Sequence, residues 1–349
     1  MTAPASRVGV IVIGRNEGDR LRRCLDSVLP VSTHVIYVDS GSTDGSAEAA
    51  RAKGADVVEL DMSIPFCAAR ARNVGYQRLM QRAPELRFVQ FIDGDCEIEP
   101  SWLANAVDAL DAHPAVAIVA GWLRERSPEV SIYNRIGDVQ WNIAGAGAGG
   151  GDSEVDTVGG IFTIRSEAFA AVGGFDNTVA AGEEPELCRR LMHKGWKIVR
   201  LDHGMARHDL AMTRFGQWWK RQIRSGYGGA DVAQRFALPQ FRRNNIRILV
   251  WSAWLVVVAA LAAWSIGGGN TVAAVLCVAV AALWPVQVLR IASQIRRKRQ
   301  PAPLSLLYAT FLMISFWPQL IGQLMYWNDR WHKRTFRLVE YKAPGSSGR

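Results

Sequence analysis

The chain has 349 residues, of which 49% are hydrophobic and 21% are charged, and its formal net charge is +9 at pH 7. This balance excludes a disordered chain and a small disulfide-built domain, and the length suits two domains or one large domain with an appendage. The five cysteines are scattered without a Cys-x-x-Cys pair, which favours a reducing compartment and argues against a zinc site.

Short apolar runs alternate with helical patterns through residues 7–210. The runs expected to form strands are residues 8–13, 34–38, 57–60 and 88–92, and a further apolar stretch lies at 196–201. Helical patterns lie at residues 20–29, 47–53, 68–81 and 187–194. This alternation predicts an α/β domain whose mostly parallel sheet is covered by helices on both faces. The first apolar run passes directly into Arg15, so we expect a strand there and no signal peptide.

Polar clusters follow three of these strands, at residues 15–17, 39–44 and 93–95. In open α/β sheets, ligands bind beyond the carboxyl ends of the strands. Asp93 and Asp95 are separated by one glycine, so they can reach one hard cation, although Asp-Gly also marks ordinary turns. Asp39 can accept from a nucleotide base or a ribose hydroxyl, or it can belong to the cap of the next helix.

Three further acidic or imidazole side chains are candidates for the same site. Glu183 and Glu184 precede a predicted helix, where acids interact favourably with the helix dipole or where one of them acts as a general base. His203 and His208 flank a predicted loop, and His208 is a candidate third metal ligand. The Gly/Ala-rich stretch at 144–151 is expected to be a surface loop rather than a lid.

Basic residues and long apolar runs are concentrated in the last third of the chain. From Phe241 to Arg349 there are 14 Lys and Arg residues against two acids, whereas residues 1–240 carry 27 basic and 30 acidic side chains. The basic residues therefore indicate a membrane anchor rather than a face that binds nucleic acid. Uncharged runs at 248–266 and 272–289 predict a hairpin that crosses the bilayer twice, a buried soluble hairpin being the alternative.

The basic residues that flank the hairpin predict its orientation. They precede and follow it, whereas the turn at 267–270 has none, so both outer flanks should be cytoplasmic. A third uncharged run at 304–327 is interrupted by Trp317 and Pro318 and is followed by more basic residues. We expect an in-plane or re-entrant segment there, with a third span as the alternative.

An amphipathic helix is expected at residues 211–226, ahead of the hairpin. Its apolar stripe contains Trp218 and Trp219, which is typical of a helix lying on an anionic leaflet, although a solvated helix has a similar pattern. The basic side chains that would contact lipid or acceptor phosphates are Arg214, Lys220, Arg221 and Arg224.

Six segments in order resemble the family 2 glycosyltransferases, inverting enzymes with the Rossmann-like GT-A fold. They are VIVIGRNEGDRLRRCLDSVL, VIYVDSGSTDGS, ARARNVGY, FIDGDCEIEP, GGIFTIRSEAFAAVGGFDN and GEEPELCRRL. A basic stretch that ends at residues 337–342 is also similar to membrane-associated members. The resemblance covers roughly residues 7–210. With the apolar and basic runs, it predicts a cytoplasmic GT-A domain (1–210), interfacial helices (211–245), a membrane hairpin (246–290) and a third apolar segment with a basic loop and tail (291–344).

The resemblance also implies a role for each candidate. Asp39, Arg72, Asn16 and Glu17 would contact the nucleotide sugar together with Asp93. Asp95 would be the more direct Mn²⁺ or Mg²⁺ ligand, helped by Asp93 and His208. Glu184 would be the catalytic base, but the family's Glu-Asp pair is Glu-Glu here, so Glu183 stays a candidate.

The function that the resemblance implies is transfer of one sugar from a UDP- or GDP-linked donor to a lipid-linked acceptor, at the cytoplasmic face of the inner (plasma) membrane. One alternative acceptor is polyprenyl phosphate itself. Processive synthesis is disfavoured, because Gln217-Trp-Trp-Lys-Arg221 lacks the Trp that follows the basic residue in processive synthases. A catalytically idle membrane scaffold is disfavoured by the run of acids, and a nucleic-acid binder by the position of the basic residues.

Overall fold

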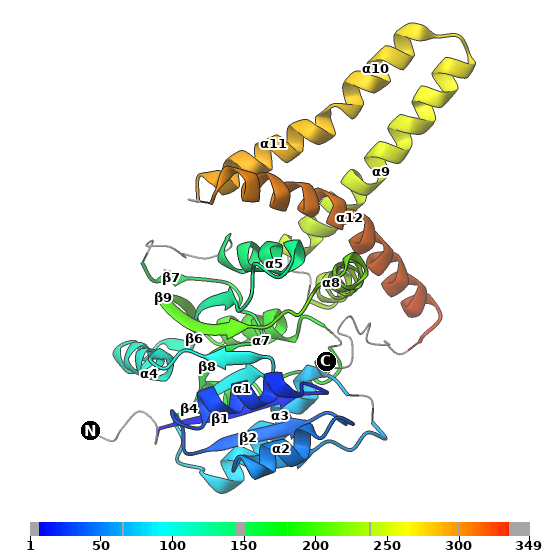
Figure 1. The fold of residues 1–349 in the computed structure, drawn as a ribbon. Helices are drawn as coiled ribbons and strands as arrows, with labels where there is room; N and C mark the ends of the chain where they lie inside the picture. Colours follow the sequence, from blue (N-terminus) through cyan, green and yellow to red (C-terminus); the bar gives the residue numbers. More distant parts are fainter. Residues whose placement is uncertain are drawn as a thin grey trace. The chain divides into compact units, whose positions relative to one another are not determined.

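The computed structural model describes residues 7–64, 66–143, 151–179, 181–236, 239–298 and 300–334. The chain forms two compact units, which meet along the sequence at Thr213 and Arg214 (Figure 1). The Gly/Ala-rich residues 144–150 and the basic tail at 335–349 lie outside the described residues.

Nine strands of the first unit form one sheet within the residues that the structure describes, in the order β3-β2-β1-β4-β8-β6-β9-β5, with β7 paired to β9. Their bounds are β1 Val8–Gly14, β2 Val35–Asp39, β3 Asp56–Glu59, β4 Phe88–Asp93, β5 Cys96–Ile98, β6 Val116–Glu125, β7 Ser153–Glu154, β8 Phe162–Arg165 and β9 Lys197–His208. Strands β1 to β4 are parallel, and β8 runs antiparallel between β4 and β6. The sheet is therefore mixed and mostly parallel, as expected.

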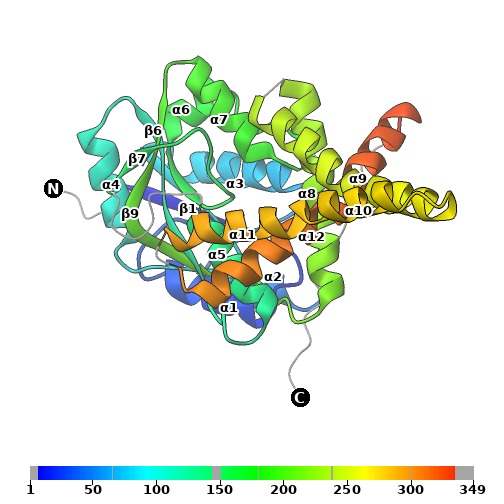
Figure 2. The ribbon, with the colours of Figure 1, turned by 90° about the horizontal axis from the view of Figure 1, so that it is seen from above.

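Seven helices belong to the described part of this unit. They are α1 Asp19–Val28, α2 Ser46–Ala52, α3 Ala68–Arg82, α4 Trp102–Ala112, α5 Ile132–Ile143, α6 Ser166–Ala171 and α7 Glu183–His193. In α1, the apolar side chains recur at helical spacing and are all buried, which fixes the face that packs on the sheet. Figure 2 shows α3 on one face of β1 and α1 with α2 on the other, so helices cover both faces.

Aromatic side chains fill the core behind the end of β4. The rings of Phe91, Phe162, Phe169 and Phe175 lie with centroids 5.3 to 6.3 Å apart in tilted or edge-on pairs. The Arg72 guanidinium lies over the Phe175 ring at 5.4 Å. This cluster gives the Arg72 side chain a rigid apolar support at the sheet edge.

The prediction of a loop at His203 and His208 was wrong. Both residues belong to β9, which continues to His208 because each stretch of it has a partner strand. It pairs with β6 on one side and with β7 and then β5 on the other. Pairing gives hydrogen-bond partners to the backbone groups of residues beyond 201. The apolar pattern at 196–201 did not predict that the strand extends so far.

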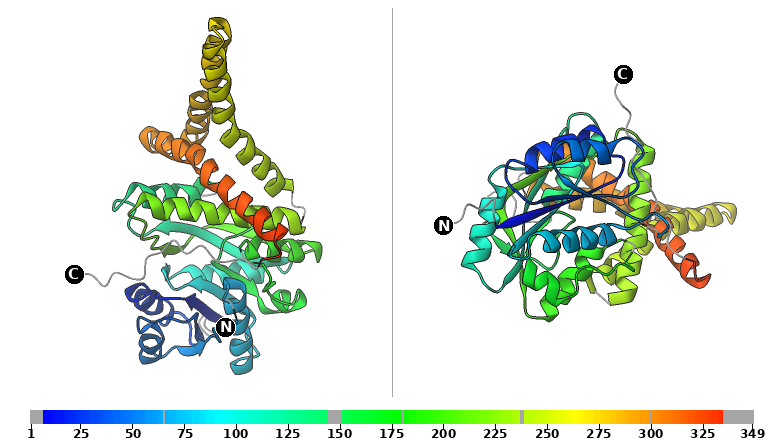
Figure 3. Two further views of the ribbon diagram at one scale, coloured as in Figure 1. Left: turned by 90° about the vertical axis from the view of Figure 1, so that its right-hand side faces the viewer. Right: turned by 90° about the horizontal axis from the view of Figure 1, so that it is seen from below.

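The second unit consists of helices α8 Phe215–Phe236, α9 Pro239–Gly267, α10 Thr271–Ala281, α11 Leu283–Arg296 and α12 Ala302–Trp331, within the described residues. Figure 3 shows α9 and α10 side by side as a hairpin. Three helical stretches of the described chain are long and apolar enough to cross a membrane, at Gln240–Gly267, Thr271–Arg296 and Ala302–Trp331.

The expected interruption at Trp317 and Pro318 is absent, because α12 continues through Pro318. A proline inside a helix removes one hydrogen bond and favours a kink, but packing can hold the helix together. Here α12 packs along α8, α9 and α11 within the unit. Length and composition thus make α12 a candidate span as well.

Candidate functional site

Parallel strands bring polar residues to one edge of the sheet. Gly14 at the end of β1 lies opposite Asp39 of β2, and Ile13 lies opposite Asp93 of β4. At the carboxyl ends of these three adjacent strands, one aspartate therefore lies on each side of β1.

Asp39 is held by the protein at this edge. It is 2% exposed, its Oδ1 accepts from the Tyr37 hydroxyl at 2.9 Å, and its Oδ2 accepts from the Ser42 N–H at 2.7 Å. The carboxylate therefore fixes the turn after β2 without capping α2 through its side chain. Its predicted contact with a nucleotide stays a prediction.

Asn16 and Glu17 stabilise the loop after β1. Asn16 Oδ1 accepts from the Thr43 N–H at 2.8 Å, and the Asn16 N–H donates to Ser42 Oγ at 2.9 Å. Asn16 has a positive φ of 55°, a conformation that asparagine tolerates better than most residues. Glu17 Oε2 pairs with Arg20 Nε at 2.9 Å. Two loops of the edge are thereby joined into one preorganised surface.

Arg72 of α3 gathers three of the candidate acids. Its Nη2 lies 3.2 Å from Asp93 Oδ1, and its Nη1 lies 3.0 Å from Glu183 Oε1 and 3.2 Å from Glu184 Oε1. Its side chain is 3% exposed. Because a buried guanidinium needs carboxylate partners, Arg72 fixes the positions of all three acids at the sheet edge.

Glu183 and Glu184 lie in the first turn of α7, which begins four residues earlier than predicted. The preceding Gly182 has a φ of 94°, a left-handed conformation that glycine adopts without strain. Burial, reinforced by the neighbouring Glu183 carboxylate, raises the pKa of Glu184 to about 7 against the opposing charge of Arg72. A carboxyl with that pKa can exchange a proton near neutral pH.

Gly160 packs against this charged cluster. A Cβ placed on Gly160 would lie 2.5 Å from Arg72 Nη2 and 3.2 Å from both Asp93 Oδ2 and Glu184 Oε1. The Gly160 carbonyl also accepts from Arg72 Nη2 at 3.4 Å. The sequence analysis included Gly160 only within a motif. No sequence pattern shows that its backbone lies so close to Arg72.

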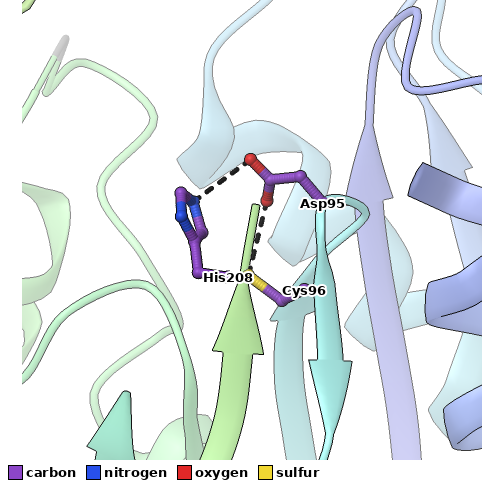
Figure 4. Close-up of side chains that lie close together, drawn as sticks. All are labelled: Asp95, Cys96 and His208. Carbon is purple, nitrogen blue, oxygen red and sulfur yellow. Dashed lines mark hydrogen bonds and ion pairs between the residues drawn. The ribbon is translucent and has the colours of Figure 1, made fainter. Parts of the chain in front are cut away.

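Asp95 has different partners from Asp93, although one glycine separates them. Its Oδ2 lies 3.1 Å from His208 Nε2, and its Oδ1 accepts from Cys96 Sγ at 3.4 Å (Figure 4). Ligand atoms of these three buried residues lie within 4.8 Å of one another, and Asp93 is not in the group. The two acids expected to grip one cation thus have separate protein contacts.

The donor set of this group fits a divalent cation. A carboxylate suits Mn²⁺ and Mg²⁺, and an imidazole suits softer divalent ions, so the pair can hold a divalent cation. His208 Nδ1 is buried without a hydrogen-bond partner among the residues that the structure describes. The Trp141 ring lies edge-on to the imidazole at 4.8 Å and limits its movement.

Glu125 at the end of β6 lies beside His208, on the opposite side of β9 from Cys96. The β6–β9 register places Glu125 opposite His208. Its carboxylate accepts from the backbone N–H groups of Ser127 and Leu210 at 3.2 Å and from Asn134 Nδ2 at 3.1 Å. Burial raises the pKa of Glu125 to about 7. Neither Glu125 nor Cys96 was a candidate in the sequence, because strand pairing between distant segments brings them beside His208.

The expected membrane-facing stripe is partly covered within the second unit. Trp218 of α8 is 3% exposed and lies edge-on to Phe311 of α12 at 5.1 Å, so its expected position facing lipid is wrong. Close helix packing buries it in protein instead. Trp219 is half-buried, whereas the basic side chains of Arg214 and Lys220 are exposed and those of Arg221 and Arg224 are half-buried.

Family models match most of the first unit. Residues 9–173 match the model of glycosyl transferase family 2, and residues 150–214 match that of the N-terminal domain of galactosyltransferase. These ranges include every acid of the site and His208.

Curated relatives match over most of the chain. Glycosyltransferase AglE of Haloferax volcanii is 25% identical over 74% of this chain and 82% of its own. Pre-mycofactocin glycosyltransferase of Mycobacterium tuberculosis is 30% identical over 67% of this chain, but the match spans only 49% of that relative. Succinoglycan biosynthesis protein ExoU of Rhizobium meliloti is 26% identical over 57% of this chain and 61% of its own.

A solved structure shares the fold over almost the whole chain. The mannosyltransferase PcManGT from Pyrobaculum calidifontis, in complex with GDP-Man and Mn²⁺, superimposes with a TM-score of 0.62 at 20% identity, covering 94% of this chain and 89% of that one. The shared fold, the family match and the curated relatives agree on the family of this chain. The chain belongs to glycosyltransferase family 2 and is a nucleotide-sugar glycosyltransferase of GT-A fold with three apolar C-terminal helices.

Proposed function

We propose that the protein transfers a single sugar from a nucleotide-sugar donor to a lipid-linked acceptor at the cytoplasmic face of a membrane, with inversion at the anomeric carbon. The observation that carries this proposal is the convergence of Asp93, Glu183 and Glu184 on the buried Arg72 at the carboxyl edge of the sheet. Ligands of open α/β sheets bind at that edge.

Glu184 is the proposed base. Its carboxylate removes the proton of an acceptor hydroxyl while the oxygen attacks the anomeric carbon and the nucleoside diphosphate departs. Its raised pKa suits this work, since a base with a pKa near the working pH combines a useful deprotonated fraction with sufficient basicity. Arg72 holds the carboxylates of Glu183 and Glu184 in place before the donor arrives.

Asp95 and His208 would hold the Mn²⁺ or Mg²⁺ ion. Such an ion would offset the negative charge that develops on the departing diphosphate. Asp39 and Asp93, at the ends of β2 and β4, would position the nucleoside. The GDP-Man and Mn²⁺ in the PcManGT complex support a nucleotide-sugar donor and a divalent cation.

The second unit supports a lipid-linked acceptor. Three helices of the described chain are suited to a membrane, and the exposed Arg214 and Lys220 side chains can contact acceptor or lipid phosphates. The curated relative named for succinoglycan biosynthesis supports a role in glycoconjugate or polysaccharide assembly.

The test is transfer by the full-length chain in detergent or native membranes. A panel of UDP- and GDP-sugars is supplied with Mn²⁺ and lipid extracts, and radiolabelled lipid product is measured. We expect transfer from one donor, its loss on chelation, and its loss in Asp95→Ala. The exposed Asp108→Ala on α4 is the matched control and should retain full activity. A fully active Asp95→Ala enzyme would refute the metal role, and incorporation from no donor would refute the transfer.

A further inference from the structure

We propose that Cys96 is a third protein ligand in the Asp95–His208 site, so that the site binds Zn²⁺ and related thiophilic cations more tightly than a carboxylate and an imidazole alone would. The scattered cysteines argued against zinc, because that argument considers ligands close along the sequence. Cys96 and His208 are far apart along the chain and meet because β5 and β9 pair them directly.

The three donors lie close enough together to share one ion. The Asp95 carboxylate lies between the other two residues, 3.1 Å from His208 Nε2 and 3.4 Å from Cys96 Sγ (Figure 4). Ligands at zinc–ligand distances of 2.0–2.3 Å in a tetrahedron are separated by about 3.3–3.8 Å. The two separations, each to a different Asp95 oxygen, approach this range, and one ligand atom from each of the three residues lies within 4.8 Å of the others.

Burial makes the arrangement specific. Cys96 is fully buried, Asp95 is 3% exposed and His208 is 9% exposed. The Cys96 thiol points at the same Asp95 carboxylate that His208 Nε2 contacts, so one ion between the three side chains can take all of them as ligands. Cys24, another buried thiol nearby, contacts the Asp93 carbonyl instead at 3.7 Å and is outside the group.

The thiol changes which ion the site prefers. Thiolate ligands select zinc and other soft cations, whereas carboxylates and water suit Mn²⁺ and Mg²⁺. On binding, the Cys96 thiol gives its proton to the buffer and the sulfur becomes a ligand. Three protein ligands on a four-coordinate ion leave one position for a diphosphate oxygen. Zn²⁺ should thus compete with Mn²⁺ and inhibit transfer, a consequence that rests on the proposed function, whereas the binding itself does not.

The test uses Co²⁺ as a spectroscopic substitute for Zn²⁺, added to the full-length metal-free protein in detergent without any sugar. We expect a near-ultraviolet thiolate-to-cobalt charge-transfer band that saturates at one equivalent and is abolished by one equivalent of Zn²⁺. Cys96→Ser should bind Co²⁺ without the band, and its affinity for Zn²⁺ relative to Mn²⁺ should fall at least about tenfold. Cys24→Ala and Cys67→Ala are the matched controls and should keep the band.

Two outcomes would overturn the inference. One is saturating Co²⁺ binding to the unaltered protein without a thiolate band, a result that depends on no variant folding. The other is an unchanged preference for Zn²⁺ over Mn²⁺ in Cys96→Ser. A Cys96-dependent band in a protein that transfers no sugar from any donor would support the binding inference and contradict the proposed function.

Discussion

Glu184 differs from the other acids of the site in the balance of its contacts. Arg72 stabilises its carboxylate, but burial and Glu183 oppose the charge, and the net effect is a raised pKa. A purely structural ion pair would favour the opposite direction. We therefore expect Glu184→Gln to lower kcat on the order of 10²-fold or more while the KM for the donor changes little.

The comparison for that measurement is Glu183→Gln, which removes a neighbouring carboxylate that also contacts Arg72. If Glu184 is the base, Glu183→Gln should retain most of the turnover. An almost silent Glu184→Gln would instead indicate an acceptor that is already ionised, such as polyprenyl phosphate, which needs no base. The two variants thus distinguish the acceptor classes.

The pH dependence follows from the sign of the Glu184 shift. The base works only when deprotonated, so kcat/KM should fall as the pH drops below about 7 and should level off above it. Because the Glu183 charge contributes to raising the Glu184 pKa, Glu183→Gln should move this acid limb to lower pH. Initial rates across a pH series, for both proteins at subsaturating substrate, check the direction. An acid limb that stays in place would contradict the coupling.

Gly160 allows the charged cluster to assemble. A methyl group there would lie 2.5 Å from Arg72 Nη2, so Gly160→Ala should displace Arg72 and lower turnover about tenfold or more while the protein stays folded. Gly159→Ala is the matched control, since nothing lies within 4 Å of a Cβ at that position. Turnover and thermal melting are measured for both. Equal effects of the two substitutions would contradict a specific role for Gly160.

In the second unit, helices α8 and α12 pack closely at a pair of glycines, one on each helix. A Cβ on Gly226 would lie 2.0 Å from the Gln319 carbonyl oxygen, and one on Gly322 would lie 2.1 Å from the Ile223 carbonyl oxygen. Backbone atoms cannot move aside as side chains can. The close approach also brings Gln222 and Gln319 within hydrogen-bond distance at 3.3 Å.

Substituting either glycine should separate the helices. We expect Gly226→Ala and Gly322→Ala each to destabilise the second unit by about 1–3 kcal/mol, the usual cost of overpacking. Thermal unfolding in detergent, followed by tryptophan fluorescence, measures the effect because Trp218 is buried in the same interface. Gly216→Ala, also in α8 with nothing near its Cβ, is the control and should melt like the unaltered protein.

Hydrophobic patterns predicted the elements that are amphipathic or strictly apolar. The strands β1, β2 and β4 and helix α1 appear where their runs of apolar residues indicated. The prediction failed at β9 and at Pro318, where partners distant in sequence decide the outcome. The last residues of β9 are held as a strand between β5 and β6, and α12 passes through Pro318 while it packs on other helices.

Over the whole molecule, the sequence predicted that candidate residues share one edge of the sheet, but not how the contacts of Asp93 and Asp95 differ. Strand ends predicted that Asp39 and Asp93 share an edge, and the register agrees. That Asp93 contacts Arg72 while Asp95 contacts His208 and Cys96 depends on side-chain directions after the turn at Gly94. Such directions are set by tertiary packing, which no periodicity encodes.

The distribution of basic residues predicts which side of the membrane each end of the apolar helices faces. Basic residues flank the α9–α11 hairpin and follow α12, while the turn at 267–270 has none. The positive-inside rule favours a turn on the outer side and both flanks in the cytoplasm. If α12 also crosses, its basic end emerges outside, against that rule, although its length and composition permit crossing.

Single introduced cysteines separate these possibilities in right-side-out membrane vesicles labelled with an impermeant maleimide. The new cysteines are introduced into a protein that carries Cys67→Ser and Cys277→Ala, because these two native thiols are only half-buried and could also be labelled. We expect Gly268→Cys to be labelled at once, and Ser63→Cys and His332→Cys, both at exposed positions, only after permeabilisation. Immediate labelling of His332→Cys would show that α12 crosses. Immediate labelling of Ser63→Cys would place the catalytic unit outside and contradict transfer at the cytoplasmic face.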